Sequence, residues 1–128
     1  MFDRPVVRHD REVPEEVVEV GNKKRARFRM LFSADRTETH SLTCGIANLD
    51  RDNPLPLHRH AHAEIYIGLS GEAEVKVKGQ SFRLSEGTAV FIPGNLEHAV
   101  HSGSNAKLLF MFSADSYQDV HYVYLDDD

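Results

Sequence analysis

Cysteine and tryptophan are scarce in this chain of 128 residues, which holds one cysteine and no tryptophan. A single cysteine, Cys44, cannot form a disulfide within the chain, so packing rather than cross-linking has to stabilise the fold. Disulfide-free chains are typical of reducing compartments. We therefore expect a cytoplasmic location.

Long apolar runs are also missing. No stretch reaches the roughly 18 apolar residues of a membrane span, and the opening Met-Phe-Asp-Arg-Pro lacks the basic and apolar regions of a secretory signal. With neutral histidines the net charge is -5, which repels phosphate backbones. We expect neither a membrane nor a nucleic acid as a partner.

Apolar residues make up 41% of the chain and charged residues 27%, and the length suits one hydrophobic core. No segment has a long 3.6-residue apolar period. Short runs alternate instead, as where Ala26, Phe28 and Met30 are separated by arginines. Many short strands at spacings of roughly ten residues, divided by glycine and proline, predict an all-β fold, an antiparallel barrel or sandwich.

The alternation also predicts where the strands lie. Residues 1–23 show no sustained period and are expected to form an N-terminal arm or edge segment, 24–125 the barrel, and 126–128 a frayed acidic tail. Ser70-Gly71 is expected to be a turn. Strands are expected from residue 24 to 32 and over 41–49, 64–69, 72–78, 81–84, 88–92, 98–101, 107–112 and 120–125.

One expected strand is apolar on its second face as well. Ile65, Ile67 and Leu69 lie opposite Glu64 and Tyr66. A small barrel has few ways to cover a second apolar face, so a partner subunit or the N-terminal segment has to bury it. We therefore expect a homodimer.

Four residues have the character of metal ligands. His58 and His60 are two positions apart and point to the same side of an extended strand. Glu64 follows four residues later, and His98 belongs to a later strand. Nitrogen ligands with one carboxylate suit one divalent transition metal ion (Fe, Mn, Ni, Zn or Co). Four protein ligands leave open positions on a five- or six-coordinate ion, which could act as a Lewis acid.

Two neighbouring side chains have roles that the pattern leaves open. His62 could be a fifth ligand, an acid–base group or a solvated loop residue. Tyr66 lies two residues beyond Glu64, so its ring should enter the same pocket. It is either a packing aromatic whose hydroxyl reaches water or a backbone carbonyl, or a general base whose pKa a nearby cation lowers.

The spacing of these residues resembles a known family. His58-x-His60-x3-Glu64-x6-Gly71 resembles the first cupin motif, and Gly87-x5-Pro93-x-Asn95-x2-His98 resembles the second. In the second motif, Asn95 replaces the usual glycine. Asparagine tolerates positive φ, so this change is mild. The resemblance implies a small single-domain cupin, a double-stranded β-helix or jelly-roll barrel of antiparallel strands, with the metal held by His58, His60, Glu64 and His98.

A closer resemblance is to the small cupin lyases that cleave dimethylsulfoniopropionate. It rests on residues 58–71, 92–99 and 115–122. It implies that Tyr66 acts as a base in a β-elimination on a small carboxylate substrate, giving dimethyl sulfide and acrylate. Further pocket residues are expected among His62, Phe91, Phe110 and Tyr122. An iron-dependent cupin dioxygenase uses the same ligand set, and a non-catalytic metal- or ligand-binding cupin is a third interpretation.

Overall fold

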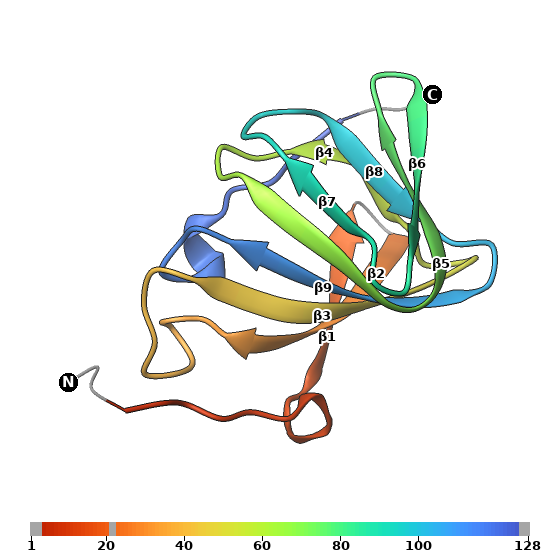
Figure 1. The fold of residues 1–128 in the computed structure, drawn as a ribbon. Helices are drawn as coiled ribbons and strands as arrows, with labels where there is room; N and C mark the ends of the chain where they lie inside the picture. The colour runs from red at the N-terminus through yellow and green to blue at the C-terminus, as the bar shows by residue number, and fades with distance from the viewer. Residues whose placement is uncertain (1–3, 21–22, 126–128) are drawn as a thin grey trace.

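Ten antiparallel strands curl into a barrel within residues 4–20 and 23–125, which the computed structural model describes (Figure 1). This confirms the predicted all-β fold. The strands are β1 (Glu15–Val20), β2 (Lys23–Phe32), β3 (Thr43–Asp50), β4 (Leu55–Arg59), β5 (Glu64–Val77), β6 (Gln80–Ser85), β7 (Ala89–Ile92), β8 (His98–His101), β9 (Asn105–Phe112) and β10 (Val123–Tyr124). Two short 3-10 helices, η1 (Asp10–Glu12) and η2 (Tyr117–Asp119), complete the described elements.

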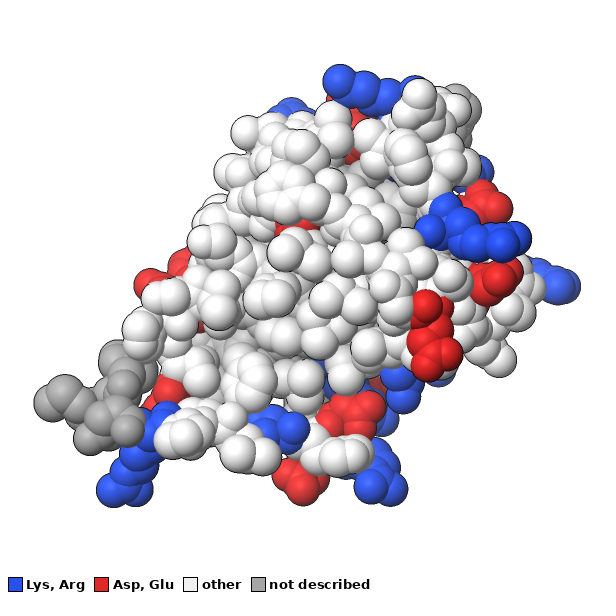
Figure 2. All heavy atoms as spheres, viewed as in Figure 1, with Lys and Arg blue, Asp and Glu red and all other residues white. Residues whose placement is uncertain are grey.

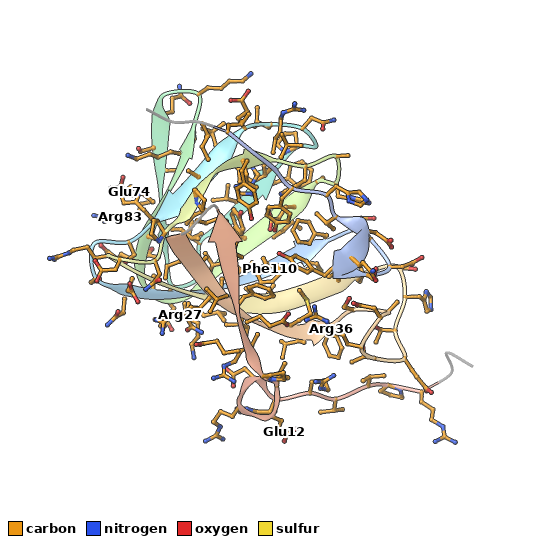
Figure 3. All side chains as sticks on the ribbon, turned by 180° about the vertical axis from the view of Figure 1, so that it is seen from behind. Glu12, Arg27, Arg36, Glu74, Arg83 and Phe110 are labelled. Atoms are coloured by element: carbon orange, nitrogen blue, oxygen red, sulfur yellow. The ribbon has the colours of Figure 1, made fainter. Side chains whose placement is uncertain are left out.

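The core lies inside the barrel because alternate residues of neighbouring strands point inward in register. Met30 of β2 pairs with Gly45 of β3, Gly45 pairs with Phe110 of β9, and Phe110 pairs with Tyr66 of β5. A Cβ on Gly45 would lie 2.5 Å from the Phe110 ring, so glycine at this position makes room for the aromatic side chain. Phe110 lies within the barrel, whereas charged residues such as Glu74 and Arg83 lie on its outside (Figure 3).

The expected turn at Ser70-Gly71 is wrong, because β5 continues through it to Val77. The first half of β5 pairs with β7 and β9, and the second half pairs with β6 and β8. A register shift between Gly68 and Ser70 and a φ of 69° at Gly71 bend the strand from one set of partners to the other. This bend lets one strand take part in both walls of the barrel.

The two ends of the chain depart from a simple barrel. β1 lies within the stretch expected as an N-terminal arm or edge segment, and it ends the strand order beside β2. Of the strand expected over 120–125, only Val123 and Tyr124 are strand residues, because η2 and an irregular stretch precede them. The expected acidic tail, 126–128, lies outside the described residues.

The outer face of β5 stays half-buried at Ile65, Ile67 and Leu69. β1 leaves this face uncovered because it sits at the far end of the sheet, beyond β2 and β3. The surface over β3, β5, β7 and β9 shows mainly uncharged side chains (Figure 2). The homodimer remains a prediction. None of the described helices has the length and apolar character needed to cross a membrane.

Candidate metal centre

Four buried side chains from three parts of the barrel meet at one point. His58 lies on β4, His60 directly after it, Glu64 at the start of β5 and His98 at the start of β8. Each side chain offers one ligand atom, and these atoms all lie within 4.8 Å of one another. All four residues are 0–2% exposed. The geometry is that of a site that could hold a metal ion.

Each imidazole ring is aimed by a backbone carbonyl two residues away. Nδ1 of His58 donates to the Pro56 carbonyl, that of His60 to the His62 carbonyl and that of His98 to the Leu96 carbonyl, each at 2.8 Å. A carbonyl only accepts, so each Nδ1 carries a proton and each Nε2 is left to face the cluster. Metal-binding histidines are typically oriented in this way.

The donor atoms fit a metal ion. Nε2 of His58 is buried and has no hydrogen-bond partner among the described residues. A buried nitrogen lone pair without a partner is costly unless something else satisfies it. One carboxylate oxygen of Glu64 lies 3.1 Å from Nε2 of His60 and 3.3 Å from Nε2 of His98. Three imidazole nitrogens and one carboxylate form a donor set suited to a divalent transition metal.

Burial and charge set the protonation of this cluster. Burial, with the charge of His98, lowers the pKa of His58 to about 3, so this ring stays neutral at physiological pH. Burial also acts to lower the pKa of His60, but the hydrogen bond to Glu64 and its negative charge outweigh burial and raise it. Burial acts to raise the pKa of Glu64, and hydrogen bonds from His60 and His98 reverse this and lower it.

Cross-strand pairing and one loop place the ligands. His58 is the direct partner of His98 across β4 and β8. The loop before β8 is tied back to the first ligand loop, because the backbone N–H of Asn95 donates to the His60 carbonyl at 2.7 Å. Asn95 has a φ of 65°, a value that glycine or asparagine tolerates. The substitution of asparagine for the usual motif glycine therefore preserves the loop.

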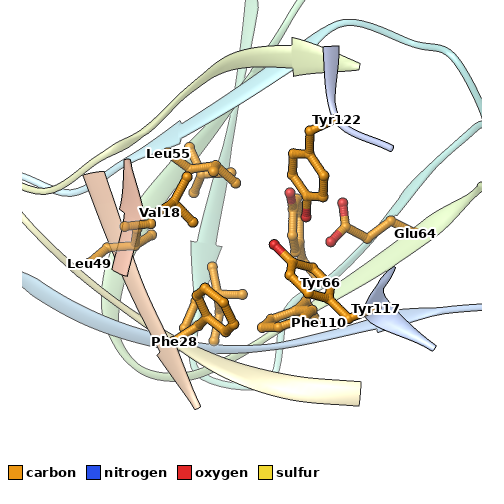
Figure 4. A pocket seen from close by; sticks show the side chains of 13 residues that line it. Val18, Phe28, Leu49, Leu55, Glu64, Tyr66, Phe110, Tyr117 and Tyr122 are labelled. Carbon is orange, nitrogen blue, oxygen red and sulfur yellow. The ribbon is translucent and has the colours of Figure 1, made fainter. Parts of the chain in front are cut away.

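A cavity inside the barrel begins at Glu64. It is lined by 13 residues, of which Tyr66, Tyr117 and Tyr122 lie beside the Glu64 carboxylate (Figure 4). Tyr66 is 1% exposed, and its hydroxyl forms no hydrogen bond of ordinary geometry among the described residues. Burial and the charge of Glu64 raise the pKa of Tyr66 well above its ordinary value, so the phenol is protonated in this state.

Two of the additional pocket residues expected from the sequence reach the cavity, and two do not. Phe110 and Tyr122 line it, and the Tyr122 ring stacks on His58 with 4.9 Å between ring centroids. The expectation for Phe91 is wrong, because Ile92 takes the inward position on β7 and leaves Phe91 65% exposed. His62 is not among the four clustered residues, although its carbonyl accepts the His60 hydrogen bond.

Tyr117 is a cavity residue that sequence reasoning missed. It lies on η2, where no strand-like alternation marks which residues point inward. Its backbone N–H donates to the Ser33 hydroxyl at 2.8 Å, which fixes η2 against the end of β2. Burial raises the pKa of Tyr117 to about 12. The pairing of residues 84 positions apart could not be read from the sequence alone.

Comparisons with known proteins agree on the architecture. The sequence profile of the cupin domain family matches residues 50–113, half of the chain. The polyketide cyclase RemF from Streptomyces resistomycificus superposes with a TM-score of 0.75 at 20% identity, covering 100% of this chain and 89% of the cyclase. No curated protein sequence matches this chain.

In two further solved structures, the part that superposes on this chain is a smaller share of the known protein. The DMSP lyase DddQ from Ruegeria pomeroyi DSS-3 gives a TM-score of 0.66 at 25% identity, covering 78% of this chain and 51% of the lyase. The iron(II) form of HppE gives 0.69 at 22% identity, covering 88% of this chain and 62% of that protein. This chain therefore spans about half of the lyase, and these likenesses describe a shared fold.

Proposed function

The chain belongs to the cupin domain family, and from this premise we propose that it is a metal-dependent lyase acting by β-elimination on a small carboxylate-bearing molecule. One observation carries the proposal. Glu64, one of the four clustered ligand residues, also lines a cavity in which the Tyr66 phenol lies beside its carboxylate. This places a potential metal site and a potential proton acceptor on the same side of one small space.

His58, His60, Glu64 and His98 would hold the ion, because their donor atoms already converge. When bound, a divalent ion supplies positive charge that attracts a carboxylate, acidifies the adjacent C–H bond and favours the phenolate form of a nearby tyrosine. The protein contributes imidazole rings held by backbone carbonyls and a mainly apolar cavity wall. Both limit the reorganisation that a charged transition state would otherwise require.

Tyr66 would act as the base. Its phenolate oxygen would take the proton from the carbon next to the substrate carboxylate. The electrons of that C–H bond would form the new carbon–carbon double bond, and the leaving group would depart from the β carbon with its bonding pair. Tyr66 suits this role because it is two residues from Glu64 on β5 and lies beside the ligand cluster, where a bound ion would oppose the burial and the Glu64 charge that raise its pKa.

The experiment that tests this proposal is Tyr66→Phe. The chain is loaded in turn with each divalent metal, the metal content is measured, and dimethyl sulfide is assayed in the headspace above dimethylsulfoniopropionate. We expect turnover to be lost while about one ion per chain remains bound, because the phenol is not in the ligand cluster. Full activity of the variant would remove Tyr66 from the mechanism.

An iron-dependent dioxygenase is the second candidate, and the ligand set itself favours it. Three neutral imidazole nitrogens and one carboxylate also suit Fe(II) with positions open for a substrate and oxygen. This candidate predicts oxygen consumption and strict dependence on Fe(II). Anaerobic activity with Mn or Zn would exclude it. Tight binding of a small acid without any turnover would favour a ligand-binding protein instead.

A further inference from the structure

We propose that the cavity selects substrates whose body, beyond the carboxylate, is uncharged and apolar, and that it disfavours acids of the same shape with a cation on the body. This inference rests on the proposed function, because it assumes that the carboxylate faces the ligand cluster. It concerns the opposite end of the cavity, which the ligand residues do not form.

The cavity has one polar end and one apolar end. Glu64 and the three tyrosines lie together at one end (Figure 4). Val18, Leu49 and Leu55 lie at the other end, and Phe28 lies between them and the tyrosines. Among the described residues that line the cavity, Glu64 is the only charged one. The far end therefore offers neither an acidic partner nor a hydrogen-bond acceptor side chain to a charged group.

The charge balance disfavours a second cation in this space. A divalent ion with one carboxylate and three neutral imidazoles leaves the ligand end positive, which suits a carboxylate. Once the substrate carboxylate is bound there, its charge and that of Glu64 balance the ion, so a cation on the substrate body would find no excess negative charge at this end and only apolar walls beyond it. Burying an unpaired charge is costly. The faces of Phe28 and Phe110 could offset part of this cost by cation–π attraction, but they supply no counter-charge.

The free space in the cavity is small, so ligand size has to be controlled in any test. About 30 Å³ is free, room for about one water molecule. A substrate body must therefore displace part of the wall. Val18 lies on β1, which ends the strand order and pairs with β2 alone among the described strands. Because size alone could decide binding, the ligands compared must have the same shape.

The test is a pair of isosteric acids, 4,4-dimethylpentanoate and 3-(trimethylammonio)propanoate, which differ in one carbon exchanged for a positively charged nitrogen. Each is titrated into the cobalt-loaded full chain by calorimetry, and the visible spectrum of cobalt reports occupancy of the site. We expect the neutral acid to bind at least about tenfold more tightly, because only the cationic body is left without a partner. Equal or tighter binding of the cationic acid would overturn the inference, as would failure of both acids to bind.

A variant pair sharpens the result. Val18→Asp places a carboxylate at the apolar end and should shrink the tenfold preference or reverse it. Val17→Asp is the matched control on the same strand, because Val17 is 39% exposed and is not a cavity residue. It should keep the preference of the original chain. An unchanged preference in a folded, cobalt-loaded Val18→Asp protein would place the substrate body elsewhere and overturn the inference.

The wild-type comparison stands without either variant, so a Val18→Asp chain that does not fold leaves the inference testable. Because the acids are compared by binding, the result is also separate from the proposed lyase reaction. Dimethylsulfoniopropionate carries a cation on its body, so this inference expects it to bind weakly. Absence of dimethyl sulfide release even at saturating concentration would count against the proposed reaction, and the isosteric pair would still report on the cavity.

Discussion

The two faces of the first half of β5 are built from neighbouring residues and differ in what they contact. Glu64 and Tyr66 point inward, where they are at most 2% exposed and border the cavity. Ile65 and Ile67 point outward and remain half-buried. The surface over this part of the barrel shows mainly uncharged side chains (Figure 2). Alternation along one strand therefore puts a candidate ligand and a tyrosine on the inner face, and on the outer face apolar residues that the described part of the chain covers only in part.

The largest effect should come from removing an inward ligand. We expect His98→Ala to lower metal affinity by more than about 100-fold, because even loss of a residue that supports a ligand costs 10–100-fold. Elemental analysis after dialysis measures the occupancy. His101→Ala is the matched control on the same strand, since His101 points outward and is partly exposed beside Glu74. Equal metal content in the two variants would contradict the assignment of His98 as a metal ligand.

The bend that carries β5 between the barrel walls should be the next most sensitive point. Gly71→Ala should lower the free energy of unfolding by roughly 2–4 kcal/mol, because positive φ is strained for alanine and the close contact adds to that cost. A Cβ at this position would lie 2.0 Å from the Asn105 carbonyl oxygen. Urea unfolding measures the change.

Gly87→Ala is the control for that bend. Gly87 also has positive φ, at 86°, but a Cβ there would meet nothing within 4 Å. Gly87→Ala should lower the free energy of unfolding by only about 1–2 kcal/mol, because the backbone conformation alone is strained. If the two variants lose similar amounts of unfolding free energy, the close approach of Gly71 to β9 contributes little to the cost of Gly71→Ala.

Metal binding should also release a proton and weaken as the pH falls. Both ring nitrogens of His60 face acceptors, and Glu64 raises the pKa of His60 above its ordinary value of 6.5. Below that raised pKa the ion must displace the His60 proton, so affinity should rise with pH until the pKa is passed and then level off. Calorimetry in buffers of different ionisation enthalpy measures the released proton. Identical heats of metal binding in all buffers would show that no proton is released, which would contradict a protonated His60 in the metal-free protein.

A substitution on the outer face of β5 should affect the fold least. Its main effect should be on assembly. Ile67→Asp should convert the expected homodimer to monomers while metal content stays unchanged, because Ile67 points away from the cluster. Sedimentation velocity measures the mass. Val123→Asp, at an exposed position on β10, is the control and should leave the assembly intact. A monomeric wild-type chain would show that the homodimer prediction is wrong.

The sequence predicted the barrel because its strands alternate with period 2, and the inward positions of β3 and β9 follow that pattern. The clustering of the four ligand residues could also be anticipated, since His58 and His60 share a strand side and the motif spacing brings Glu64 and His98 to them. The alternation and the shared side of His58 and His60 depend on local geometry, whereas the approach of His98 was implied by the resemblance to the cupin motifs.

The errors arose where a local signal had two meanings. Ser70-Gly71 is a common turn pair, but the same glycine also allows a bend within a continuous strand. Phe91 and Ile92 are both apolar, and only the pairing of β7 with β5 determines which one points inward. Tyr117 reaches the cavity through a contact with Ser33 that no local pattern encodes. In each case tertiary pairing decided the outcome.

The carbonyls that aim the three imidazoles have a consequence for how this protein could change. Each ring is held by a peptide unit two residues from its own position, at Pro56, His62 and Leu96. The aliphatic residues at the far end of the cavity do not take part in these hydrogen bonds. Residues such as Val18 and Leu55 could be exchanged over evolutionary time, or by design, to admit a different molecule while the ligand rings keep their aim.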